Sequence, residues 1–226
     1  MKVQVIDYRA KDAPQRFVES LKQTGFGVLT NHPIEQQLVN SIYEKWQTFF
    51  KQGNPNDFAF DADTQDGYFA SEISETAKGH EHKDIKEYYH VYPWGRIPEP
   101  LKKDVLNYYD MASSLAAQLL DWVEQFSPED IATGYSEPLS QMIKNTPNTL
   151  LRILHYPPFT GSEAKGALRA AAHEDINLLT ILPAANEPGL QVQDSGGEWL
   201  DVPADFGHLI INIGDMLQEA SGGYFP

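Results

Sequence analysis

The sequence predicts an α+β fold in which a helical N-terminal part precedes a group of short antiparallel strands. Over residues 98–126, apolar side chains recur at steps of three and four, the longest helical pattern in the chain. After Thr149 the pattern changes to short apolar runs that end at proline or glycine. Because no helical pattern separates these runs, they indicate an antiparallel sandwich or barrel rather than a parallel α/β sheet.

Composition and charge narrow the class of protein. The chain has 226 residues, and its 41% hydrophobic content is enough to bury a sizeable core. No apolar run approaches the roughly 18 residues that a membrane span needs, and the first eight residues do not resemble a signal peptide, so we expect a cytoplasmic protein. The net charge of −15 argues against nucleic acid as a partner. Because the chain has no cysteine, any metal must be bound by nitrogen and oxygen ligands.

Patterns in the first 51 residues predict two strands and two helices. Residues 3–8 alternate between apolar and polar and predict a strand. A helix follows, with Asp12 as its cap and its end at Thr24 and Gly25. We expect a second strand over residues 26–30 and a second amphipathic helix over residues 35–51.

Residues 53–79 are polar and lack a sustained period, which predicts an irregular surface segment. Tyr68 and Phe69 within it are candidate substrate-pocket residues, although an anchoring role is equally compatible with the pattern. His80 and His82 have a spacing that a metal site could use, but the charges around them favour a solvated segment. A strand over residues 87–92 follows.

The remaining pattern gives the order of the elements up to Asp215. After the helix at residues 98–126, helical fragments are expected near Ile131 and Met142. The predicted strands cover residues 150–156, 178–182 and 209–213, with a hairpin over residues 189–203 that turns at Ser195, Gly196 and Gly197. Gly214 and Asp215 are expected to form a turn.

A candidate metal site lies at the start of AHEDINLLTIL. In a strand, His173 and Asp175 point to the same side and Glu174 to the other. An imidazole and a carboxylate are two of the three ligands of the facial triad that binds non-heme Fe(II). A solvated turn would explain the same pair of residues. His155 and His208 are the other histidines of the strand-rich part, and neither has a position that favours it as the third ligand.

Several motifs, taken in order, resemble one family. LKQTGFGVLTNHPI, DIKEYYHV, LLRILHYPP, AHEDINLLTIL, GLQVQDSGGEWLDVP and GHLIINIGDML are similar to segments of the isopenicillin N synthase-like iron- and 2-oxoglutarate-dependent oxygenases. The likeness covers nearly the whole chain. It implies a double-stranded β-helix, or jelly roll, with a non-haem dioxygenase N-terminal region at residues 1–97, a helical scaffold at 98–147 and an oxygenase core at 148–226.

The resemblance also implies roles for single residues. His173 and Asp175 match iron ligands, and Tyr156 matches a tyrosine that often contacts the carboxylate of 2-oxoglutarate. Leu154 stands where plant members usually carry asparagine, which puts that contact in doubt. The segment that includes Asn212, Gly214 and Asp215 matches a mainly structural motif of the family.

The family's second histidine ligand and its oxoglutarate-binding arginine would follow Pro226. We therefore expect either a natural protein that continues, with the last strands of the jelly roll and the third iron ligand beyond this sequence, or a truncated product without catalysis.

The function implied is oxidation of a C–H bond of a small molecule with Fe(II), O2 and 2-oxoglutarate, giving succinate and CO2. Hydroxylation, desaturation and cyclisation are all compatible with the motifs. Two alternatives stay open: an iron-dependent oxidase of the same fold that does not use 2-oxoglutarate, and an inactive jelly-roll binding module. The primary substrate and the oligomeric state do not follow from the sequence.

Overall fold

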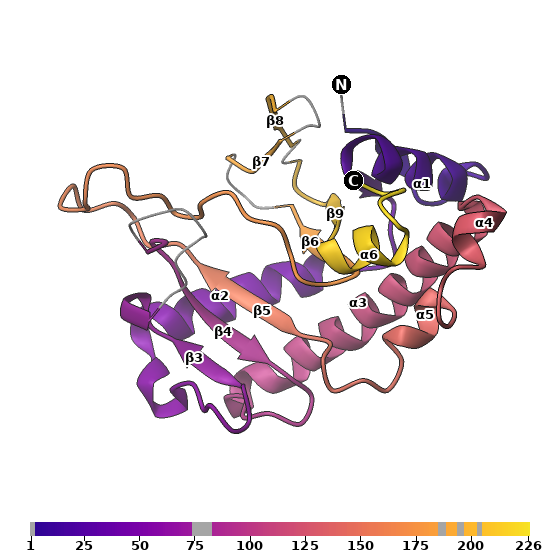
Figure 1. Cartoon of the computed structure of the whole chain (residues 1–226). Helices are drawn as coiled ribbons and strands as arrows, with labels where there is room; N and C mark the ends of the chain where they lie inside the picture. The colour runs from indigo at the N-terminus through magenta and orange to yellow at the C-terminus, as the bar shows by residue number, and fades with distance from the viewer. Residues whose placement is uncertain (1–2, 74–82, 185–188, 194–196, 203–204) are drawn as a thin grey trace. The chain divides into compact units, whose positions relative to one another are not determined.

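Helices and strands alternate along the chain in a mixed α+β arrangement (Figure 1). The computed structural model describes residues 3–73, 83–184, 189–193, 197–202 and 205–226. The α-helices are α1 (Ala13–Thr24), α2 (Gln36–Gln52), α3 (Glu99–Phe126), α4 (Glu129–Ala132), α5 (Leu139–Met142) and α6 (Asp215–Ala220). The strands are β1 (Val5–Asp7), β2 (Phe26–Thr30), β3 (Gly67–Phe69), β4 (Glu87–Val91), β5 (Leu151–His155), β6 (Leu179–Pro183), β7 (Gln191–Gln193), β8 (Trp199–Asp201) and β9 (Leu209–Ile213). Short 3-10 helices are η1 (Pro55–Phe58) and η2 (Ser71–Ile73).

The chain divides into two units, each made of separate pieces of the sequence. One unit contains residues 1–36, 111–146 and 174–226, and the other contains residues 37–110 and 147–173. We call them the first and the second unit. Helix α3 contributes its first part to the second unit and its last part to the first. The boundaries 1–97, 98–147 and 148–226 stay a prediction.

The first unit contains a four-stranded sheet with the order β1-β2-β9-β6, in which only β1 and β2 run parallel. The hairpin β7-β8 belongs to the same unit. Six buried side chains form a core between these elements: Val3, Val28, Ala184, Val192, Val202 and Ile210. Helix α1 ends where predicted, because Gly25 adopts the left-handed conformation and its N–H bonds the carbonyl of Leu21. Asp12 occupies the cap position, but its side chain makes no capping hydrogen bond, so that prediction is wrong.

The second unit contains the antiparallel sheet β3-β4-β5. Figure 1 shows α2 behind this sheet, and aromatic contacts agree, since the Trp46 ring lies 5.0 Å from the Tyr89 ring and the Phe50 ring 5.2 Å from the His155 ring. Strand β3 lies inside the segment that we expected to be irregular. That prediction is wrong for Gly67–Phe69, because pairing with β4 fixes these residues. Residues 74–79 of the segment lie outside the described residues.

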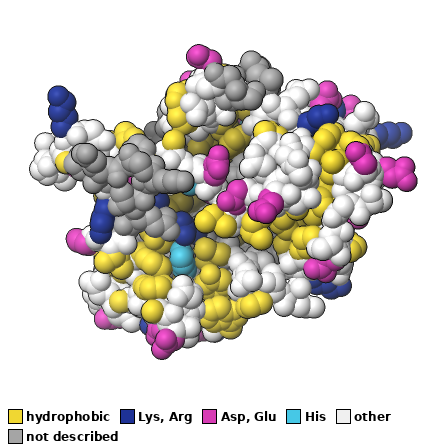
Figure 2. Space-filling view, in the orientation of Figure 1, with side chains coloured by type: hydrophobic (Ala, Val, Ile, Leu, Met, Phe, Trp, Pro, Cys, Tyr) yellow, Lys and Arg dark blue, Asp and Glu magenta, His cyan; other side chains and the backbone are white. Residues whose placement is uncertain are grey.

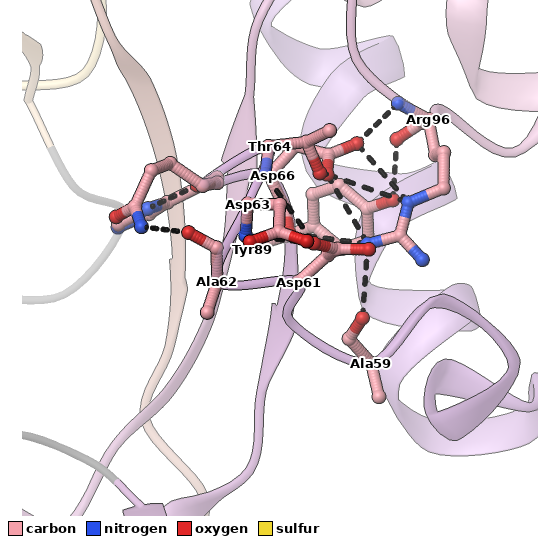
Figure 3. A network of polar contacts seen from close by, with 10 residues as sticks. Ala59, Asp61, Ala62, Asp63, Thr64, Asp66, Tyr89 and Arg96 are labelled. Carbon is pink, nitrogen blue, oxygen red and sulfur yellow. Dashed lines mark hydrogen bonds and ion pairs between the residues drawn. The ribbon is translucent and has the colours of Figure 1, made fainter.

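A polar network holds the loop before β3 to the segment between β4 and α3 (Figure 3). The carboxylate of Asp66 accepts a hydrogen bond from Nη2 of Arg96 at 3.1 Å and one from Thr64 Oγ1 at 2.6 Å. The backbone N–H of Arg96 also donates to it. Asp66 is only 1% exposed, so a buried carboxylate here is fully paired.

Most other predicted elements are confirmed to within a residue or two: the strand at residues 150–156 is β5, and the helical fragments are α4 and α5. The hairpin is also confirmed, but its expected turn residues Ser195 and Gly196 lie outside the described residues. Asp215 begins α6 instead of completing a turn. None of the helices in the described part of the chain is sufficiently long and apolar to cross a membrane.

Candidate metal centre

His173 and Asp175 lie in a coil segment that precedes β6, not in a strand. Strand β6 begins only at Leu179, so the expected alternation of side chains along a strand does not apply, and that part of the prediction is wrong. Residues two apart in one chain have α-carbons within about 7 Å of each other, whatever the local conformation. His173 is the last residue of the second unit, and Asp175 belongs to the first, so their joint role in metal binding stays a prediction.

The imidazole of His173 has a defined tautomer. Its Nδ1 lies 2.8 Å from the carbonyl oxygen of Ala171. A carbonyl only accepts, so Nδ1 carries the hydrogen, and in the neutral ring the lone pair is on Nε2. Metal-binding histidines typically have this arrangement, in which one nitrogen donates to a backbone carbonyl and the other binds the metal. The side chain of His173 is exposed.

Neutral donors from two paired strands hold the carboxylate of Asp175. Thr180 Oγ1 of β6 donates to Asp175 Oδ2 at 2.5 Å, and Asn212 Nδ2 of β9 donates to the same oxygen at 2.9 Å. Thr180 and Asn212 are direct partners in the β6-β9 register. Asn177 Nδ2 donates to Thr180 Oγ1 at 2.8 Å, which directs the hydroxyl hydrogen of Thr180 toward the carboxylate. These three side chains orient the carboxylate of Asp175.

The turn between β9 and α6 holds the backbone of the same segment. The N–H of Asp215 donates to the carbonyl of Asp175 at 3.0 Å, and the N–H of Gly214 donates to that of Leu178 at 3.3 Å. A β-carbon at position 214 would lie 2.3 Å from the carbonyl oxygen of Asn177 and 2.4 Å from that of Asp175. Position 214 is therefore occupied by glycine because the backbone before β6 passes directly over it.

A buried ion pair in the second unit holds the chain just before His173. Asp84 Oδ1 accepts a hydrogen bond from the N–H of Ala171 at 3.0 Å, and its Oδ2 lies 2.9 Å from Nζ of Lys86. Asp84 is 5% exposed and Lys86 4%. The N–H of Ile85 also donates to the carbonyl of Leu168, at 2.9 Å. Sequence reasoning missed Asp84 and Lys86. The signal that could have found them is a pair of opposite charges, the first and third residues of DIKEYYHV, directly before strand β4.

Tyr156 follows β5 in the second unit and is 39% exposed. Burial of its hydroxyl raises its pKa, and nearby Asp84 adds to this effect, while Arg152 opposes it. The hydroxyl therefore keeps its hydrogen at neutral pH and can donate a hydrogen bond to an anion. His155 faces the other side of β5, as expected from strand alternation, and its Nδ1 lies 2.6 Å from Glu87 Oε1.

The two candidate pocket residues lie on opposite faces of the small sheet. Tyr68 is buried on the α2 side, where its hydroxyl donates to Glu87. Phe69 lies on the other face, with its ring 4.5 Å from that of Tyr88. Their role in substrate binding stays a prediction, and the structure separates them.

Of the remaining histidines, those that the structure describes are not grouped into a metal cluster. His32 Nε2 bonds the carbonyl of Gly207 at 2.9 Å, while Nδ1 of His208 is buried without a hydrogen-bond partner. His80 and His82 lie outside the described residues. Among the residues that are described, no three His, Asp or Glu side chains form a group able to hold a metal ion. The donors present at residues 173 and 175, a neutral imidazole nitrogen and an oriented carboxylate, fit Fe(II) chemically.

Two family descriptions together match most of the chain. Residues 3–114 match the family described as the non-haem dioxygenase in morphine synthesis N-terminal, and residues 147–226 match the 2OG-Fe(II) oxygenase superfamily. The chain is 32% identical over 133 residues to a 2-oxoglutarate-dependent dioxygenase, citB, of Monascus ruber. That match covers 57% of this chain and 39% of the fungal protein, so the chain spans well under half of that relative.

Solved structures match over the whole chain. A crystal structure of a putative oxygenase from Shewanella oneidensis is 64% identical, has a TM-score of 0.90, and matches 100% of this chain and 81% of its own. A full-length protein of Neurospora crassa, crystallised in complex with alpha-KG, is 19% identical, with a TM-score of 0.78 over 99% of this chain and 76% of its own, and is evidence of fold alone. These likenesses confirm the predicted double-stranded β-helix fold class with a helical N-terminal region.

Proposed function

The chain belongs to the 2OG-Fe(II) oxygenase superfamily, and from this premise we propose that it oxidises a C–H bond of a small molecule with Fe(II), O2 and 2-oxoglutarate. Succinate and CO2 are the coproducts, and the oxidation is a hydroxylation, a desaturation or a cyclisation. The observation that carries the proposal is the pair of oriented donors at residues 173 and 175. An imidazole with its lone pair on Nε2 is two residues from a carboxylate that neutral donors hold.

In this proposal His173 and Asp175 bind the iron. Bound iron supplies the oxidation chemistry, which is coupled to the decarboxylation of 2-oxoglutarate. The residues of this chain around the two ligands hold them in position. The carbonyl of Ala171 fixes the His173 tautomer, and Thr180 and Asn212 fix the carboxylate of Asp175, so neither ligand has to reorganise when the metal binds.

Tyr156 is proposed as a donor to a carboxylate of 2-oxoglutarate. Its raised pKa keeps the hydroxyl protonated, as a donor to an anion requires. Leu154, two residues earlier on the same side of β5, is apolar and adds no polar contact. Of these two residues, only Tyr156 could therefore donate a hydrogen bond to the oxoacid.

The test is anaerobic addition of Fe(II) and then 2-oxoglutarate to the protein, with iron binding and the visible spectrum measured separately. We expect stoichiometric iron binding and a weak visible charge-transfer band when 2-oxoglutarate is added. His173→Ala should lose both, whereas His208→Ala, a histidine of the same strand-rich part, should keep both. Tyr156→Phe should bind iron normally and require more 2-oxoglutarate to form the band.

The other outcomes separate the alternatives. Iron binding without the band would indicate an oxidase that does not use 2-oxoglutarate. Absence of both would indicate a binding module and would overturn the proposal.

A further inference from the structure

The chain segment that leads to His173 is buried at a single residue. Ala170, Ala172 and His173 are exposed, whereas Ala171 is only 4% exposed. An alanine side chain has little apolar surface, so its burial contributes little to holding an otherwise exposed coil in place. The backbone contacts of Ala171 therefore have to account for the position of this segment in the second unit.

Both backbone groups of Ala171 take part in hydrogen bonds. Its N–H donates to Asp84 Oδ1 at 3.0 Å, and its carbonyl oxygen accepts the hydrogen on Nδ1 of His173 at 2.8 Å. Only the two backbone torsions of Ala171 separate the N–H from the carbonyl. A carboxylate that holds the N–H therefore also helps to fix the acceptor that orients the imidazole.

Asp84 is itself held in a buried ion pair. Its Oδ2 lies 2.9 Å from Nζ of Lys86, and the two residues are 5% and 4% exposed. They lie directly before β4, and Figure 2 shows apolar side chains over the sheet that follows, with basic side chains and a histidine beside them. A buried pair of opposite charges keeps one geometry, because separating the two groups would leave each charge buried without the other.

A second contact ties the same two segments together. The N–H of Ile85 donates to the carbonyl of Leu168 at 2.9 Å. Two neighbouring residues, Asp84 and Ile85, thus hold two points of the coil that are three residues apart. All of these residues belong to the second unit, as His173 does. Two points of attachment define the direction of a segment as well as its position, so the carbonyl of Ala171 is directed at the imidazole before any metal binds.

We propose that Asp84 is a positioning residue for the iron ligand His173, and that Lys86 keeps its carboxylate in place. The inference rests on the proposed function, in which His173 binds iron through Nε2. Asp84 acts through Ala171 and does not contact the metal. Removing a group that orients a metal-binding histidine typically lowers metal affinity by about tenfold to hundredfold.

A role in stability alone would have a different consequence, and Asp66 provides the control for it. Asp66 is also a buried carboxylate of the second unit with a basic partner, Arg96. Its hydrogen bonds join the loop before β3 to the segment between β4 and α3. Asp66→Asn should therefore lower stability and leave both the iron affinity and the tautomer of His173 unchanged.

The test compares two double variants that both lack the buried charges. Asp84→Asn with Lys86→Met keeps an amide oxygen that accepts from the N–H of Ala171. Asp84→Leu with Lys86→Met has nearly the same shape but no acceptor. Fe(II) affinity is measured by anaerobic titration. We expect the asparagine variant to bind Fe(II) nearly as tightly as the unmutated protein, and the leucine variant to bind it about tenfold more weakly.

The tautomer of His173 gives a second readout that needs no metal. NMR of the ring nitrogens in the metal-free protein, at about pH 8 and therefore above the ordinary pKa of histidine, shows which nitrogen carries the hydrogen. The unmutated protein and the asparagine variant should carry it on Nδ1. The leucine variant should populate both tautomers, because the carbonyl of Ala171 is no longer held beside Nδ1.

The outcomes separate the inference from the function on which it rests. Absence of iron binding by the unmutated protein overturns the proposed function. Normal iron binding with equal affinity in the two double variants overturns only the role of Asp84, and so does a weaker affinity without a change of tautomer. An equal loss of affinity in Asp66→Asn would show that iron binding follows stability and would also overturn it.

A third double variant keeps the comparison possible if the leucine variant does not fold. Asp84→Ser with Lys86→Met has a side chain too short to reach the N–H of Ala171 directly, but it keeps a polar group at the buried position. Circular dichroism shows whether the leucine variant is folded, and the serine variant replaces it if it is not. The serine variant should then have the weaker iron affinity and the mixed tautomers, and an unchanged affinity would overturn the role of Asp84.

Discussion

Two aspartates, Asp66 and Asp175, are each held by several hydrogen bonds, but from donors of different charge. Asp66 accepts from the guanidinium of Arg96, from its backbone N–H and from Thr64, and it is almost fully buried (Figure 3). Asp175 accepts from a hydroxyl and an amide, both neutral. The first network compensates the negative charge within the protein. The hydroxyl and amide donors of the second orient the carboxylate of Asp175.

Two arginines of the second unit have different described partners. Arg96 pairs with a buried carboxylate and also donates to the carbonyl of Ala59 at 3.0 Å, so its hydrogen bonds join three segments of the fold. Arg152 donates to the imidazole of His90, and its guanidinium lies over the ring of Tyr88. The hydrogen bonds of Arg96 therefore belong to the same fold-stabilising network as those of Asp66.

The strongest test of this comparison is Asp66→Asn. The change removes the charge of a buried carboxylate that accepts several charge-assisted hydrogen bonds from Arg96, whose own side chain is 44% exposed, so the free energy of unfolding should fall by about 2–3 kcal/mol. Urea denaturation measures the loss. Iron affinity of the folded variant should not change, because the side chain of Asp66 bonds Thr64 and Arg96 and not the segment that carries His173 and Asp175. A stable variant that loses iron would contradict the structural role of this network.

Gly214→Ala should be the next largest effect. A β-carbon at position 214 would overlap two backbone oxygens of the segment that carries Asp175, which then has to move. We expect a loss of about 2 kcal/mol in stability together with weaker iron binding. Gly134→Ala is the control. A β-carbon at position 134 would lie 3.2 Å from its nearest neighbour, a carbonyl oxygen, which is close but not overlapping. An unchanged iron affinity in Gly214→Ala would show that the turn does not position the carboxylate.

One substitution made in both networks compares them directly. Thr64 and Thr180 each donate a hydroxyl hydrogen bond to an aspartate, at 2.6 Å and 2.5 Å. Thr180→Val should lower iron affinity by about tenfold, as expected when a group that orients a metal ligand is removed. Thr64→Val should leave iron affinity unchanged and lower stability by about 1 kcal/mol. Anaerobic iron titration measures the iron affinity of both variants, and urea denaturation measures their stability. Equal changes in the two variants would contradict the different roles of the two hydroxyl groups.

Local patterns in the sequence predicted the elements but not the contacts that build the site. The helix at residues 98–126 follows from the spacing of its apolar residues, and the motif around His173 follows from its residue types. Strand β3 was missed because its three residues have no pattern of their own and depend on pairing with β4. The conformation before β6 was also wrong, because Gly214 and Asp215, far along the chain, determine it. Asp84 reaches Ala171 across 87 positions, a contact that no local pattern reveals.

The smallest expected effect is the acid sensitivity of the Asp66 network. Burial raises the pKa of this carboxyl, but hydrogen bonds from Arg96 and Thr64 outweigh burial and hold the pKa below its ordinary value. A carboxyl with a lowered pKa in the folded state contributes stability that is present above the unfolded-state pKa, about 3.9, and is lost as the pH falls through the folded-state pKa. The stability advantage of the unmutated protein over Asp66→Asn should therefore be constant from about pH 7 to 5 and shrink below about pH 4. Urea denaturation of both proteins over this range measures the difference, and an advantage that grows on acidification would mean that Asp66 is protonated in the folded protein and that the pair in Figure 3 is not ionic.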